Sequence, residues 1–191
     1  TRAIGRLGQA LEFDGGNDRV EMGDVAGLQF NNESLSASAW IKTSSKSDQT
    51  IVGKWDDGAT PGGWKFRIDE LPPDGTGNPW VLTFEVNDTA GNNEKVIRGA
   101  TNMSDGAWHH VAVTWDDSTG RATVYIDGTQ DGTNTSTKRW GDNANAFAIG
   151  ANDATTAEGW VQFMTGLIDD VRIYNRALSA DEVRRLYNMG R

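Results

Sequence analysis

The sequence predicts an all-β protein, a two-sheet antiparallel sandwich of the jelly-roll type with a short C-terminal helix. Short runs that alternate apolar and polar residues recur from end to end, separated by clusters of Gly, Asn and Asp. Only the C-terminus changes to a helical period. With 191 residues and no linker, long repeat or low-complexity tract, we expect a single domain over 1–191.

The expected strands follow from the alternation. They cover 10–15, 19–23, 34–43, 49–55, 63–70, 80–88, 94–100, 109–117, 121–129, 145–151 and 161–178. Turn residues at 118–120 and 127–128 mark tight turns, so 109–128 is expected to be a hairpin. Six side chains from these strands are expected in the core: Phe84, Val111, Val113, Trp115, Val171 and Ile173.

A helix is expected over 179–189. Ser179 is placed to be its N-cap, and Glu182 three positions later completes a capping box. Val183, Leu186 and Tyr187 share the apolar face, and Gly190 is a stop signal. We expect this helix to pack on the outside of the sandwich.

Composition excludes several classes of partner. The net charge of -9 would repel a phosphate backbone, so nucleic acid is not expected. No apolar run approaches the roughly 20 residues that span a bilayer, so no membrane partner is expected either. The chain has no cysteine, which excludes disulfides and thiolate metal sites. We expect a monomer, excised from a larger secreted protein.

The segment LIDDVRIY, at 167–174, places two carboxylates side by side in an expected strand. Strict alternation would put Asp169 in line with Leu167, Val171 and Ile173 on one face, and Asp170 on the other. An ionised carboxylate in an aliphatic row must be paired, hydrogen-bonded or bound to a metal. We therefore expect Asp169 to have a cation, hydrogen-bond donors or a metal ion beside its carboxylate.

Four segments resemble a known family: GRLGQALEFDGGNDRVEM (5–22), AWHHVAVTWD (107–116), ATVYIDGT (122–129) and TGLIDDVRIYNRALSADEV (165–183). Together they resemble a laminin-G-like, concanavalin A-like jelly-roll domain, of the type attached to secreted bacterial polysaccharide-degrading enzymes and adhesins. The resemblance covers nearly the whole chain and implies the fold. It says much less about the ligand, because one fold hosts many functions.

The resemblance also implies a calcium ion held between the start and the end of the domain. Calcium takes six to eight oxygen ligands, and the turn at 14–18 offers suitable ones. The metal ligands implied are Asp14, Asn17, Asp18 and Asp169. The alternative is that Asp169 accepts backbone N–H bonds and that 14–18 is only a turn.

The eight tryptophans divide by strand position. Alternation places Trp64, Trp80 and Trp115 in the core, and Trp108 resembles a packing position of the family. Trp40 can face either way. Three others lie in polar surroundings, where an exposed indole can stack on a sugar ring while nearby polar groups bind its hydroxyls. The candidate carbohydrate-binding residues are Trp55, Asp56, Asp57, Trp140, Asn152, Asp153 and Trp160. Alternatively, each tryptophan covers a hydrophobic edge under its own loop.

No catalytic constellation is visible. A glycosidase needs two carboxylates flanking the scissile bond, and no matching pair stands on one strand face. His109 and His110 are adjacent and point to opposite faces, and His110 is expected to be a hydrogen-bonded structural residue. We therefore expect no enzyme, but an extracellular, non-catalytic carbohydrate-binding module that targets a parent enzyme or cell surface to polysaccharide. The alternatives are a protein-interaction or adhesion module and, third, a polysaccharide hydrolase or lyase.

Overall fold

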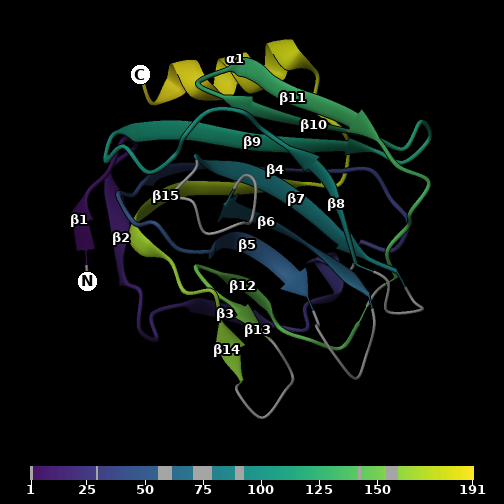
Figure 1. Cartoon of the computed structure of the whole chain (residues 1–191), viewed down its shortest axis with the longest axis horizontal. Helices are drawn as coiled ribbons and strands as arrows, with labels where there is room; N and C mark the ends of the chain where they lie inside the picture. Colours follow the sequence, from purple (N-terminus) through teal and green to yellow (C-terminus); the bar gives the residue numbers. More distant parts are fainter. Residues whose placement is uncertain are drawn as a thin grey trace.

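The computed structural model describes residues 2–28, 30–55, 62–70, 79–88, 93–141, 143–153 and 159–191, which form two facing antiparallel sheets (Figure 1). In these ranges, the seven-stranded sheet has the order β1 (Arg2–Ile4), β2 (Gln9–Asp14), β15 (Thr165–Tyr174), β4 (Leu35–Lys42), β9 (Trp108–Asp116), β10 (Arg121–Ile126) and β11 (Thr129–Thr135). The six-stranded sheet has the order β3 (Val20–Gly23), β12 (Phe147–Ile149), β5 (Gln49–Trp55), β6 (Gly63–Glu70), β7 (Trp80–Asn87) and β8 (Asn93–Arg98). Strands β13 (Asn152–Asp153) and β14 (Trp160–Val161) pair separately, and a short 3-10 helix spans Ala26–Leu28. The predicted two-sheet sandwich is confirmed.

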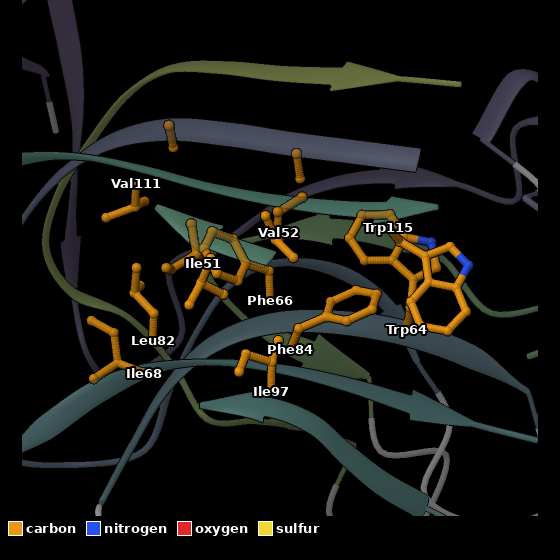
Figure 2. Close-up of a cluster of buried hydrophobic side chains, with 14 of the residues drawn as sticks. Ile51, Val52, Trp64, Phe66, Ile68, Leu82, Phe84, Ile97, Val111 and Trp115 are labelled. Atoms are coloured by element: carbon orange, nitrogen blue, oxygen red, sulfur yellow. The ribbon is translucent and has the colours of Figure 1, made fainter. Parts of the chain in front are cut away.

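The core lies between the two sheets and is built by alternate residues of each strand. Figure 2 shows Trp64 and Phe66 from β6 and Phe84 from β7 packed with Val111 and Trp115 from β9. Four of the six predicted core residues are fully inaccessible, namely Phe84, Val111, Val113 and Trp115. The other two predictions, Val171 and Ile173, are corrected, because both are only partly buried against this core.

The single α-helix of the described residues, α1 (Ala180–Met189), lies across the outer face of the seven-stranded sheet, at the top of Figure 1. The Ser179 hydroxyl accepts a hydrogen bond from the Glu182 N–H, and the Glu182 carboxylate accepts one from the Ser179 N–H, so the predicted capping box is confirmed. Val183 and Leu186 are buried on the sheet with Leu178, against Ala112 and Tyr125. In the described part of the chain, no helix has the length and apolar character needed to cross a bilayer.

A β-bulge interrupts β15 at Asp170 and changes the alternation of faces. The register against β4 shifts between Asp169 and Arg172, and Asp170 has a left-handed φ of 48°. Asp169 pairs with Trp40, whose side chain lies on the outer face, while Ile173 pairs with the core residue Ala37. The predicted alignment of Asp169 with Val171 and Ile173 is therefore wrong, because the extra residue moves the later side chains to the other face.

Candidate functional site

Asp169 fastens the N-terminal turn to the closing strand. Its side chain is buried under the turn at 5–8, and Oδ2 accepts hydrogen bonds from the backbone N–H groups of Arg6 (2.6 Å) and Leu7 (2.8 Å). Gly5 has no room for a side chain here, because an added Cβ would lie 2.2 Å from the same Oδ2 atom. The carboxylate is therefore satisfied by backbone donors, which is the second of the two arrangements considered from the sequence.

The four implied calcium ligands are not brought together. Asp14 pairs with Thr165, four residues before Asp169 on β15, which corresponds to about 13 Å along a strand. Within the turn, Asp14 Oδ1 accepts from the Gly16 N–H and Asp18 Oδ2 accepts from the Asp14 N–H. Calcium needs its oxygen ligands at roughly 2.3–2.6 Å from one ion, so Asp14, Asn17, Asp18 and Asp169 do not fit a shared ion. Among the described side chains, no group of three or more His, Asp or Glu is placed to hold a metal. Calcium binding by the chain stays a prediction.

Trp140 is buried, so the prediction that its indole is exposed is wrong. Its side chain is 1% exposed, with ring centroids 5.2 Å from Trp115 and 6.0 Å from Phe84. The indole N–H donates to the Phe30 carbonyl oxygen, which satisfies its one polar atom. The polar neighbours of Trp140 in sequence misled the prediction, because the segment crosses the end of the sandwich and closes the core.

Trp55 is also 1% exposed, but it lies on the outer side of the six-stranded sheet rather than in the core. It ends β5, and the Lys65 ammonium lies 4.1 Å from the centroid of its ring. A cation over an indole face is a favourable contact. The predicted exposure of Trp55 is wrong, and the neighbouring candidates Asp56 and Asp57 lie outside the described residues.

The outer side of β6 and β7 carries a buried ionic network, which we call the charged face: Lys65, Arg67, Asp69 and Glu85. These residues alternate with the core residues Trp64, Phe66, Ile68 and Phe84. Arg67 lies 2.8 Å from Glu85 Oε1 and 3.1 Å from Asp69 Oδ1, and Lys65 lies 3.2 Å from Glu85 Oε2. Burial costs such charges several kcal/mol each unless they are paired. Each of these four side chains has an oppositely charged partner within the network.

Within the charged face, burial raises the pKa of Asp69, but the hydrogen bond from Lys95 and the charge of Arg67 outweigh it and hold the pKa below its usual value. Sequence reasoning assigned no role to this face. The signal was present in GWKFRIDE, where charged residues alternate with the core residues of one strand.

Trp160 is the one predicted sugar platform that the described structure leaves at the surface. It is half-buried in β14 and pairs with Asp153 in β13, beside Asn152, which is buried. The Arg19 guanidinium lies 4.5 Å from the centroid of the Trp160 ring. Arg19 is the residue that directly follows the turn at 14–18. Three predicted binding residues, Asn152, Asp153 and Trp160, are therefore brought together by this hairpin.

The Trp160 hairpin adjoins the charged face through Gln162. The Gln162 side-chain oxygen is 3.4 Å from Lys65 Nζ and 3.3 Å from Thr50 Oγ1, while its carbonyl accepts from the Thr50 N–H. The Trp160 indole, the Arg19 guanidinium and the Gln162 amide thus lie together at the edge of the sheet, and the buried Lys65 fixes the Gln162 side chain. Such a mixture of aromatic surface and placed polar groups suits a polyhydroxylated ligand.

The two histidines lie on the other sheet, in β9, and the His110 ring packs near Tyr187 of α1. His110 is 1% exposed, with ring centroids 5.5 Å from Trp40 and 6.3 Å from Tyr187, so it is a structural residue. Trp40, which the sequence left open, is likewise covered by the helix end. His109 Nδ1 lies 2.9 Å from Asp127 and Nε2 lies 3.1 Å from Asp105.

These environments predict a stability maximum near neutral pH. Burial lowers the pKa of His110 to about 4, whereas the hydrogen bond to Asp127 raises the pKa of His109 to about 9. The stabilisation from neutral His110 is present above pH 6.5 and is lost as pH falls toward 4. The stabilisation from protonated His109 is present below pH 6.5 and is lost as pH rises through 9.

Urea unfolding of wild type and His110→Phe over this pH range measures the first effect. Wild type is expected to lose on the order of 2 kcal/mol relative to the variant between pH 6.5 and 4. A pH-independent difference between the two proteins would contradict the assignment. Comparing them cancels the titration of the carboxylates that both share.

The two-sheet sandwich with one helix on its seven-stranded sheet is the architecture of lectin-like jelly-roll domains. The family model described as the concanavalin A-like lectin/glucanases superfamily, in its laminin-G division, matches residues 14–184. The chain therefore belongs to this family.

Known proteins resemble this chain in sequence or in structure. A rat protein, "Sushi, von Willebrand factor type A, EGF and pentraxin domain-containing protein 1", is 29% identical over 113 residues, which are 57% of this chain and 3% of the relative. This chain thus corresponds to a small part of that protein. Domain 4 of AbnA, an extracellular GH43 arabinanase from Geobacillus stearothermophilus, in complex with arabinotriose, is 25% identical with a TM-score of 0.70, covering 97% of this chain and 80% of that one. The binding domain of Paraclostridial Mosquitocidal Protein 1 has a TM-score of 0.73 at 18% identity, covering 99% and 45%.

Proposed function

We propose that this chain is a non-catalytic carbohydrate-binding module that holds a parent enzyme or a cell surface against polysaccharide outside the cell. The observation that carries the proposal is the surface at Trp160, where Arg19 lies over the indole and Gln162 continues onto Lys65 of the charged face. The likeness to an arabinanase domain in complex with arabinotriose supports a glycan as the ligand.

The carboxylates of the charged face do not fit a catalytic role. A glycosidase acid must keep a proton at neutral pH, which requires a raised pKa. Asp69 instead has a lowered pKa, and both Asp69 and Glu85 are held by Arg67 at hydrogen-bonding distance. These carboxylates serve as fixed partners of cations.

A protein-interaction or adhesion module is the second candidate, and one feature favours it. Apolar side chains are exposed in the first part of the chain, with Ile4 89%, Leu11 42% and Val25 44% accessible. Contiguous exposed apolar area is typical of protein contacts. In that case, binding would depend on Ile4 and Leu11 and not on Trp160.

Replacing Trp160 by alanine is expected to weaken polysaccharide binding about tenfold, equivalent to about 1.4 kcal/mol, because the stacking surface is removed. Affinity electrophoresis against a set of soluble polysaccharides measures the retardation. Trp160→Phe keeps an aromatic ring and is the matched control, expected to retain most of the binding. Thermal stability should change little, since the residue is half-buried. Undiminished retardation of Trp160→Ala would refute the role of this surface.

A further inference from the structure

The outer face of the seven-stranded sheet is only partly covered by α1. The part of the sheet covered by α1 ends at Trp40. Gly190, just after the helix, packs so closely there that an added Cβ would lie 2.5 Å from Trp40 Nε1. Arg6 closes this edge, because its Nε donates to the Gly190 carbonyl and its guanidinium lies 4.8 Å from the Trp40 ring centroid. The next row of outward side chains therefore lies beyond the helix.

That row crosses four strands in register. Glu12 pairs with Leu167, Leu167 with Lys42, and Lys42 with Trp108. The four side chains share the outer face, since Phe13, Ile168, Ile41 and Val111, which stand at odd offsets from them along the same strands, point into the core. Lys42 therefore stands between Leu167 and Trp108 in this row, as directly paired cross-strand neighbours.

A cavity of about 540 Å³ opens beside this row, at the end of β4 and the start of β15. Its polar lining includes Glu12, Asp14, Lys42, Ser44 and Thr165. Within the described ranges, no hydrogen bond or ion pair engages the Lys42 ammonium or the Ser44 hydroxyl. Small-ligand sites typically enclose roughly 300–1,000 Å³ and combine apolar surface with a few polar groups.

We propose that this cavity is a second binding site, on the sheet opposite the charged face, for a neutral oligosaccharide. Hydroxyl groups of a sugar can donate to the carboxylates of Glu12 and Asp14 and accept from the ammonium of Lys42. Leu167 and Ala3, which also line the cavity, supply apolar surface for the C–H face of the ring. Two carboxylates against one ammonium disfavour an acidic sugar, because the local charge is negative.

Residue-resolved NMR of the isotope-labelled chain tests this site separately from the Trp160 surface. The probes are neutral trisaccharides (arabinotriose, xylotriose, cellotriose and maltotriose) and, as the acidic comparison, sialyllactose. We expect saturable shifts of the amides at 42–44, 106–108 and 165–167 with at least one neutral probe and none with sialyllactose. Lys42→Met keeps the aliphatic stem and should weaken these shifts about tenfold, or about 1.4 kcal/mol.

Lys46→Met, an exposed lysine outside the cavity, is the matched control and should leave the affinity unchanged. Trp160→Ala should also leave the shifts at 42–44 unchanged. The second site is overturned if no neutral probe gives saturable shifts there, if Lys42→Met does not weaken them, or if sialyllactose binds equally well. Shifts confined to 160–162 would overturn this site and support the Trp160 surface, so the two proposals fail separately.

Discussion

Replacing Trp140 by alanine is expected to lower the free energy of unfolding by about 4 kcal/mol, typical of deleting a large buried aromatic side chain. Trp140 is 1% exposed and packs against Trp115 and Phe84, so truncation leaves a cavity at the end of the core. It also leaves the Phe30 carbonyl without its indole donor. Guanidinium unfolding measures the loss.

Trp140→Phe separates the two contributions. It retains an aromatic ring in the core but removes the N–H donor, so its loss of stability should lie between wild type and Trp140→Ala. If Trp140→Ala unfolded like wild type and yet lost polysaccharide binding, Trp140 would be a ligand contact, as the sequence alone had predicted.

Replacing Asp169 by alanine is expected to destabilise the protein by about 3 kcal/mol, because the backbone N–H groups of Arg6 and Leu7 both lose a charged acceptor. For a chain of this size the melting temperature should fall by about 9 °C. Because backbone groups and not a shared ion satisfy Oδ2, the loss should be equal in calcium and in chelator. Differential scanning calorimetry in both solutions measures it.

Asp170→Asn is the matched control for Asp169. Asn tolerates the left-handed φ of 48° at the bulge, and the Asp170 carboxylate forms an ion pair with the partly exposed Arg172. Its effect should be below about 1 kcal/mol. A destabilisation by Asp169→Ala that appears only in calcium would show that Asp169 is a metal ligand after all.

Local sequence patterns predicted the strands that have one face in the core and the helix that carries its own capping residues. Strands β4, β6 and β7 alternate because each has one face in the core, and α1 carries its own capping box. The edge strand β11 was missed, because TQDGTNT pairs only with β10 on one side and has no apolar face. Strand β1 was missed for a similar reason, since its three residues form an exposed edge.

The candidate site was less predictable, because it depends on contacts between distant segments. The bulge at Asp170 reversed the face assigned to the following residues, and no local residue type announces it. Trp140 and Trp55 stand beside polar residues in the sequence, yet both are buried. Trp140 packs in the core, and Trp55 lies on the outer side of the six-stranded sheet. Trp160 could be identified, but its contact with Arg19 joins segments more than a hundred residues apart.

Binding of the purified chain to a broad glycan array, with and without chelator, tests the central claim most directly. We expect saturable binding to at least one plant, microbial or animal glycan. For a glycan held at the Trp160 surface, we expect binding about tenfold weaker in Trp160→Ala and largely retained in Trp160→Phe. An array without any bound glycan, together with capture of a protein ligand that Ile4→Ser and Leu11→Ser abolish, would contradict the carbohydrate-binding function.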